Sequence, residues 1–121
     1  MLTIVRTAAE LTLAVNEEIA AFPEEERYVM VPMIRDSVLS VLENSALGMA
    51  RFDVPYRYAH LTRALTSLNE LTSHFVVCKR VGLVSQQEHD ALKQKAESMG
   101  RQLAAALKII DTLPLEPLQG L

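Results

Sequence analysis

The sequence contains no tryptophan, and its aromatic residues amount to only 5% of the chain. A core must therefore be filled by Leu, Val, Ile, Ala and Met, which dominate a hydrophobic content of 50%. These side chains suit the packing of helices against one another. Charged residues stand at an ordinary 22%, so the composition does not indicate disorder. A chain of 121 residues has the size of one domain with a substantial core.

Three further features are scarce or missing. Cys78 is the only cysteine, which excludes an internal disulfide and fits a reducing compartment. No apolar run approaches the roughly 20 residues that span a bilayer, and no secretion signal is evident at the N-terminus. The four glycines are scattered, so there is no phosphate-binding loop. These absences predict a cytoplasmic protein without a membrane partner.

Charge is unevenly distributed along a chain whose formal net charge is −3. Residues 1–49 carry three basic and eight acidic side chains, and residues 50–81 carry five basic and two acidic ones. The local net charges are therefore −5 and +3, and the remainder contributes −1. Only the central segment is suited to a polyanion, and its excess is small for a nucleic-acid-binding domain.

Apolar residues recur at three- and four-residue steps in segments that predict helices at about residues 3–21, 32–51, 55–81 and 86–112. In the third and longest, the predicted buried stripe comprises Tyr58, Leu61, Leu65, Leu68, Thr72 and Phe75. The predicted polar stripe on the opposite side comprises Tyr56, His60, Arg63, Ser67, Glu70 and His74. In the fourth segment, Gly100 interrupts the pattern, and we expect another backbone to approach it closely because an interior glycine is otherwise unfavourable.

Breaks between the segments carry local signals. Pro23 ends the first helix, while Pro32 and Pro55 suit the first turns of the second and third, with Asp53 or Val54 as the cap. Gly82 is suited to a left-handed C-terminal cap, and Ser85 to Glu88 form a capping box. The run 24–26 of three glutamates either opens a short helical turn or, as we favour, forms a solvated corner.

Short connections between four helices predict an all-α fold, an antiparallel up-down-up-down four-helix bundle over residues 1–112. Residues 113–121 form a Pro/Leu-rich tail that is either frayed or lies as a strap on a hydrophobic groove. The helices carry more apolar residues than one inward face of each can hold. This excess favours an oligomer that buries the remaining apolar side chains between copies.

Catalytic and metal-binding patterns are weak. Glu70 and His74 are four residues apart, but no second copy exists, whereas metal sites in bundles repeat such pairs on two helices. Cys78 is flanked by Lys79 and Arg80, yet no histidine is placed by sequence to act as its base. We therefore predict no enzyme, no cofactor and no metal site.

Four basic side chains are the best candidates for a functional surface, namely Arg51, Arg57, His60 and Arg63. They lie just before and within the third helix, where they could meet RNA or an acidic protein surface. Glu70 interrupts the stripe, so a solvated face of mixed charge is the competing interpretation.

Several segments in order resemble one family of small bacterial four-helix bundle proteins. They are Phe22-Pro23 followed by 24–28 (Glu-Glu-Glu-Arg-Tyr), Ile34-Arg35 with 40–44 and Gly48, 67–71 (Ser-Leu-Asn-Glu-Leu), 82–85 (Gly-Leu-Val-Ser) and 97–101 (Glu-Ser-Met-Gly-Arg). That family includes the proteins encoded in intervening sequences of large-subunit ribosomal RNA genes. It also includes the accessory variability determinant (Avd) of diversity-generating retroelements.

This resemblance implies a non-enzymatic protein that assembles as a ring, characteristically a homopentamer. In the Avd branch the ring binds a reverse transcriptase and nucleic acid, and RNA binding is inferred for the ribosomal branch. The leading hypothesis is therefore a homo-oligomeric accessory protein associated with RNA or with a reverse transcriptase. The alternative is a structural or protein-interaction bundle of the same fold. Leu47 stands before Gly48 where the intervening-sequence group usually has an acidic residue, and the chain is acidic where Avd proteins are basic.

Overall fold

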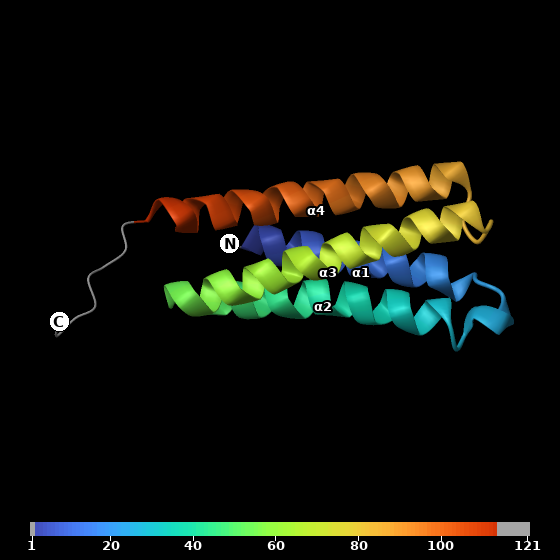
Figure 1. Cartoon of the computed structure of the whole chain (residues 1–121), viewed down its shortest axis with the longest axis horizontal. Helices are drawn as coiled ribbons and strands as arrows, with labels where there is room; N and C mark the ends of the chain where they lie inside the picture. The colour runs from blue at the N-terminus through green and yellow to red at the C-terminus, as the bar shows by residue number, and fades with distance from the viewer. Residues whose placement is uncertain (1, 114–121) are drawn as a thin grey trace.

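The computed structural model describes residues 2–113. Its elements are α1 (Leu2–Ala20), the short 3-10 helix η1 (Glu24–Glu26), α2 (Met30–Ala50), α3 (Val54–Arg80) and α4 (Gln86–Thr112). Figure 1 shows the four long helices side by side along one axis, each reversing the direction of the one before. Each packs against its neighbours in the cycle α1, α2, α3, α4. The prediction of an all-α four-helix bundle is confirmed, with no strand among residues 2–113.

Local signals in the sequence set the ends of the helices. Asp53 caps α3, because its Oδ1 accepts the backbone N–H of Tyr56 at 3.1 Å. Gly82 follows α3 in the left-handed conformation, with φ 82°. Its N–H donates to the carbonyl of Lys79 at 3.2 Å, and the N–H of Leu83 donates to the carbonyl of Cys78 at 2.8 Å. Ser85 and Glu88 then form both bonds of the capping box that opens α4. This tight reversal makes α3 and α4 antiparallel neighbours.

The acidic run at the α1–α2 corner forms a helical turn, whereas the sequence pattern favoured a solvated corner. Glu24 to Glu26 make one turn of 3-10 helix, and the N–H of Arg27 donates to the carbonyl of Glu24 at 3.0 Å. Negative side chains suit the first turn of a helix, where backbone N–H groups point outward. The ion pair between Arg27 and Glu24 spans 3.4 Å between exposed side chains, so it adds little stability.

The core lies along the bundle axis and is built mainly from aliphatic side chains. Leu11 of α1, Val38 of α2 and Leu103 of α4 are among the fully buried residues. The predicted stripe of α3 is partly wrong. Tyr58 is 45% exposed, and the buried positions are Leu61, Ala64, Leu68, Leu71, Phe75 and Cys78. The helix is rotated relative to the prediction because part of its polar stripe packs against α2.

Of the two glycines within helices, Gly48 and not Gly100 lies at a close approach to another helix. A Cβ atom on Gly48 would lie 2.8 Å from Cδ2 and 3.3 Å from the backbone nitrogen of Leu61 on α3. A Cβ on Gly100 would meet only the Leu68 Cδ2, at an ordinary 3.5 Å. The expectation of a close backbone approach at Gly100 is therefore wrong. The predicted alternatives for the C-terminal tail concern residues 114–121, which lie outside the described residues.

Candidate nucleic-acid interface

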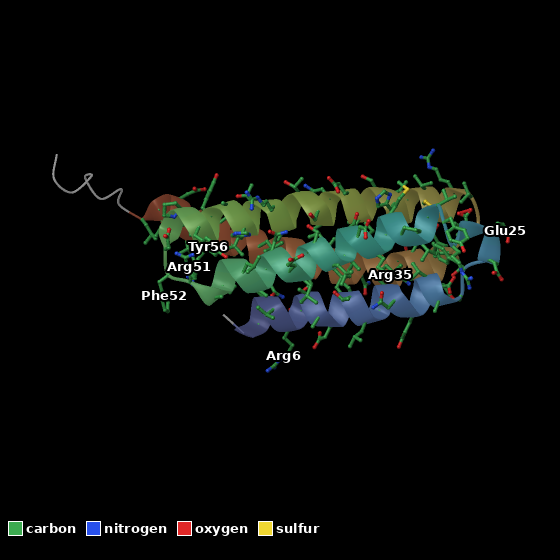
Figure 2. All side chains as sticks on the ribbon, turned by 90° about the horizontal axis from the view of Figure 1, so that it is seen from below. Arg6, Glu25, Arg35, Arg51, Phe52 and Tyr56 are labelled. Carbon is green, nitrogen blue, oxygen red and sulfur yellow. The ribbon has the colours of Figure 1, made fainter. Side chains whose placement is uncertain are left out.

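Arg51, Arg57 and His60 lie near one end of the bundle, and Arg63 lies about a third of the way along α3. This end holds the α2–α3 turn together with the start of α1 and the end of α4 (Figure 1). Figure 2 shows Arg51, Phe52 and Tyr56 gathered there, while Glu25 lies at the opposite end. Arg51, Phe52 and Tyr56 thus lie at the opposite end of the bundle from the glutamate run.

Arg51 and Tyr56 form a stacked pair on the surface of the α2–α3 turn. The guanidinium carbon of Arg51 lies 4.3 Å from the centroid of the Tyr56 ring. Its Nη2 lies 3.6 Å from Asp53 Oδ2, and the Arg51 side chain remains 57% exposed. On its other side, the Tyr56 ring lies 4.4 Å, centroid to centroid, from that of His60. The arrangement presents the Arg51 cation to solvent above a half-buried tyrosine ring.

His60 forms a hydrogen bond with a residue of α2. Its Nδ1 lies 2.9 Å from the Oδ1 of Asn44. The Nδ2 of Asn44 donates to the backbone carbonyl of Ser40 at 3.0 Å, which orients the amide and leaves Oδ1 as an acceptor. Nδ1 of His60 therefore carries the proton. The side chain is half-buried, so the outward-facing position predicted for it is wrong.

His60 and Asn44 belong to a line of hydrogen bonds that we call the α2–α3 polar ladder, made of Ser40, Asn44, His60 and Ser67. Ser40 Oγ lies 2.6 Å from Ser67 Oγ and also accepts Asn44 Nδ2 at 3.1 Å. The ladder explains why the predicted polar stripe of α3 is largely half-buried. Its residues hold two helices in register.

Arg57 is also partly withdrawn from solvent. Its Nε donates to the carbonyl of Gly48 at 2.9 Å, which satisfies one of the last carbonyls of α2 with a cation. Its guanidinium lies 5.3 Å from the centroid of the Phe52 ring. Nη2 is buried, with no hydrogen-bond partner among the described residues. Arg57 therefore stabilises the end of α2 and is poorly placed as a free phosphate contact.

Arg63 and Phe52 complete the exposed set. Arg63 lies on the exposed side of α3 and takes part in none of the ion pairs found in residues 2–113. Phe52 is 81% exposed and was not among the predicted site residues. The sequence feature that could have indicated Phe52 is an aromatic residue directly after Arg51 in a turn. We define the end surface as Arg51, Phe52, Tyr56 and Arg63.

Cys78 is buried near the other end of α3. Burial, aided by the charge of Glu26, raises the pKa of the Cys78 thiol to about 11, so it stays protonated and weakly nucleophilic at neutral pH. Within residues 2–113, no group of three or more His, Cys, Asp or Glu side chains is placed to hold a metal ion. Glu70 and His74 therefore have no third ligand of these types in that part of the chain.

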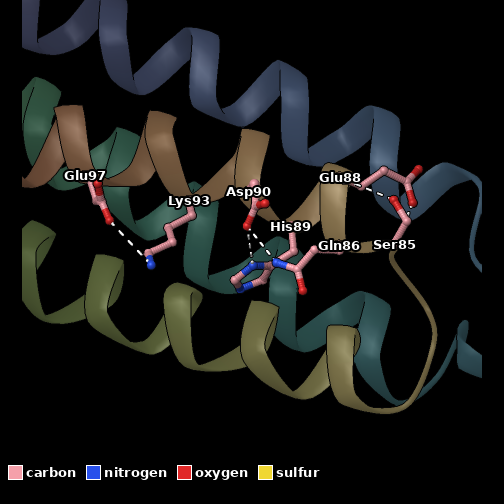
Figure 3. A network of polar contacts seen from close by, with 7 residues as sticks. All are labelled: Ser85, Gln86, Glu88, His89, Asp90, Lys93 and Glu97. Atoms are coloured by element: carbon pink, nitrogen blue, oxygen red, sulfur yellow. Dashed lines mark hydrogen bonds and ion pairs between the residues drawn. The ribbon is translucent and has the colours of Figure 1, made fainter.

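The start of α4 carries a surface network of short-range contacts (Figure 3). Two hydrogen bonds from Ser85, one from its backbone and one from its side chain, lower the pKa of Glu88. Gln86 donates to Asp90 at 2.8 Å, and Lys93 lies 3.9 Å from Glu97. These contacts join neighbours on one helix and support its local structure. None of the described helices is long and apolar enough to cross a membrane.

Comparison with known proteins identifies the family. The chain is similar to a crystallised protein of unknown function from the S23 ribosomal protein family of Bacteroides thetaiotaomicron, with a TM-score of 0.78 and 17% identity over 87% of this chain and 98% of that one. At that identity the likeness concerns the fold. No curated protein matches the sequence. The family model described as 23S rRNA-intervening sequence protein matches residues 1–105. The chain therefore belongs to the 23S rRNA-intervening sequence protein family.

Proposed function

We propose that this protein is a non-enzymatic, homo-oligomeric accessory protein that binds structured RNA through the end surface. The observation that carries the proposal is the exposed Arg51 over the Tyr56 ring, next in sequence to the exposed Phe52, with the exposed Arg63 further along α3. RNA loops offer unstacked bases that stack on aromatic side chains, and their phosphates pair with arginine. Both kinds of contact are available on this surface.

The acidic net charge does not oppose this assignment at the end surface. α3 has 27 residues, and its length is about 40 Å at 1.5 Å per residue. The glutamates at η1 lie near the far end of the bundle (Figure 2). Because the Debye length is about 8 Å at physiological ionic strength, charges at that end are screened from a ligand bound at the other.

Self-association would strengthen a site that has few cations in one copy. Large apolar side chains remain exposed on several helices: Leu13 of α1, Leu39 and Leu47 of α2, and Val76 and Val77 of α3. Burying them between copies would bring several end surfaces together, and avidity then multiplies a weak single contact. The homopentamer implied by the resemblance is the assembly we propose, and a monomer by light scattering would contradict it.

The proposal is tested with a fluorescein-labelled RNA hairpin that has a single-stranded loop. We expect salt-dependent binding, and the double variant Arg51→Glu/Arg63→Glu should lower the affinity at least about tenfold. Each lost phosphate contact should also reduce the slope of log affinity against log salt by about one. Phe52→Ala should weaken the hairpin complex but not that with a blunt duplex, because only the loop offers bases for stacking.

Arg35→Glu is the matched control, since Arg35 is an exposed arginine of α2 outside the end surface. Its change of charge equals that of one of the two replacements in the double variant, and it should leave binding almost unchanged. The absence of any binding at low salt would overturn RNA binding. The second candidate, favoured by the exposed apolar side chains, is a protein-interaction bundle without nucleic-acid binding. A reverse transcriptase, the partner implied by the likeness to Avd, would then be the first protein to test.

A further inference from the structure

A mainly apolar cavity of about 310 Å³ lies beside the end surface. Met49 of α2, Phe52 of the following turn, Val54 of α3 and Ile109 of α4 contribute to its lining. Phe52, Val54 and Ile109 are exposed. Exposed apolar side chains that gather around one hollow typically mark a binding site.

Arg57 supplies the charged group of this lining. Its Nε donates to the carbonyl of Gly48 at 2.9 Å, whereas its Nη2 is buried and has no acceptor among residues 2–113. A buried donor on a cation without an acceptor is costly. The group that complements this cavity should therefore be apolar over most of its surface and carry one hydrogen-bond acceptor.

We propose that the cavity receives an unpaired RNA base that carries a carbonyl oxygen. This assignment rests on the proposed function and deepens it, because it adds a contact that depends on the identity of the base. The faces of the base pack against the apolar lining, and its carbonyl oxygen accepts a hydrogen bond from Arg57 Nη2. Uracil, guanine and cytosine carry such an oxygen, whereas adenine does not.

The size of the cavity fits this occupant. Pockets that hold small molecules measure about 300 to 1,000 Å³, so a volume of about 310 Å³ is at the lower limit of that range. It has room for one flat heteroaromatic group. A leucine or phenylalanine side chain of another protein would fill the same space but would leave Arg57 Nη2 without an acceptor.

The cavity is also continuous with the end surface. Phe52 belongs to both, and the centroid of its ring lies 5.3 Å from the guanidinium of Arg57. A base that stacks on Phe52 is therefore close to that cation. Arg51, the preceding residue, has a side chain that is 57% exposed and accessible to the phosphates of the same strand. Bases in RNA loops are already unpaired, so their insertion requires no opening of a duplex.

Two RNA hairpins with the same stem and the same number of loop phosphates test this assignment. The loop of one consists of uridines, and in the other each uracil is replaced by difluorotoluene, which has the same shape but accepts hydrogen bonds very poorly. We expect the parent protein to bind the uridine loop about tenfold more tightly, as one hydrogen bond to a charged donor contributes. Stacking on Phe52 alone would not favour the uridine loop.

Ala106→Phe should fill the cavity, because Ala106 is part of its lining and is only partly exposed. The preference for the uridine loop should disappear in this variant, while the dependence of binding on salt concentration stays the same. Ala105→Phe is the matched control, since Ala105 is exposed and is not part of the lining. This control should keep the preference of the parent.

Equal affinity of the parent for the two loops would overturn the base pocket and leave RNA binding standing. Failure to bind either loop at low salt would overturn the proposed function, and the base pocket with it. A lower mass of Ala106→Phe than of Ala105→Phe in light scattering would also overturn the base pocket, since it would place the cavity between copies of the chain. The comparison of the two loops needs only the parent protein, so it decides the matter even if Ala106→Phe does not fold.

Discussion

α3 contacts its two neighbours in different ways, and the difference explains which sequence features matter. Against α2, the backbones come so close that Gly48 is in contact with Leu61, and the α2–α3 polar ladder links the two helices alongside. Against α4, apolar side chains such as Leu68 meet a wider space beside Gly100. A glycine and a polar stripe thus have structural roles at one interface, while a glycine at the other has no such role.

The polar ladder also changes how the candidate site is understood. Ser40 and Ser67 are separated by 27 positions, and their 2.6 Å contact forms only in one register of the two helices. A shift of one helical turn would leave half-buried polar groups without partners, which is costly. Part of the stripe that resembled an RNA-binding surface therefore specifies how α2 and α3 pair.

The largest expected effect is that of Gly48→Ala. The new methyl group would lie 2.8 Å from Leu61 Cδ2 and 3.3 Å from the backbone nitrogen of Leu61. A rotation of the Leu61 side chain would relieve the first contact but not the second. Overpacking of this kind costs about 2 kcal/mol, which exceeds the roughly 1 kcal/mol by which alanine is favoured over glycine in a helix, so the midpoint of thermal or denaturant unfolding should fall. A variant as stable as the parent would show that the α2–α3 interface yields more easily than this geometry indicates.

Gly100→Ala is the matched change at the other interface and should have the opposite sign. Its methyl group would meet Leu68 Cδ2 at 3.5 Å, an ordinary contact. Alanine is more favourable than glycine within a helix by about 1 kcal/mol. The free energy of unfolding should rise by about that amount in urea titrations. Destabilisation would mean that the two interfaces are equally tight and would remove the contrast between them.

Glu18→Gln extends the comparison to the contact between α1 and α4, where polar groups repel each other. Partial burial, and then the charge of Glu88, raises the pKa of Glu18 above its ordinary value. A raised folded-state pKa means that the folded protein favours the protonated carboxyl. Stability should therefore decline as the pH rises through that pKa. The variant should be more stable at pH 7 by roughly 0.5 kcal/mol, an amount kept small by solvent screening.

Thermal unfolding of parent and Glu18→Gln across pH 3 to 8 measures this effect. The difference between the two proteins should vanish at the acidic end, where Glu18 is protonated in both the folded and the unfolded state. Glu10→Gln is a suitable control, because Glu10 is an exposed carboxylate of α1 that is not among the charges raising the pKa of Glu18. A gain that persists unchanged at low pH would show that repulsion of the Glu18 charge is not its cause.

Features that depend on neighbouring residues were predictable. The Asp53 cap, the glycine end of α3 and the Ser85–Glu88 capping box each require contacts within a few positions, and each is present. The face of α3 was not predictable in full, because Ala64 and Cys78 are buried in place of Tyr58. Apolar spacing indicates a stripe, but the exact rotation of a long helix depends on all its partners at once.

The candidate site divides in the same way. Arg51 and Arg63 are exposed, as expected for a binding surface. Arg57 bonds to a carbonyl nine positions earlier and His60 to an amide 16 positions earlier. Both contacts join α3 to α2, so no pattern among neighbouring residues in the sequence predicts them. Phe52 was missed because exposure of an aromatic residue in a turn depends on which elements cover that turn.

The sequence by itself determined four helices, their boundaries and their antiparallel order, because periodicity, caps and short connections act over a few residues. It also carried the motifs on which family membership could be suspected. Only the tertiary structure decided that Gly48 and not Gly100 lies close to a neighbouring helix. It also decided that Arg51 and Arg63 are exposed, whereas Arg57 and His60 form hydrogen bonds with α2. These properties arise from distances between helices, which depend on side chains far apart in the chain meeting in one packed arrangement.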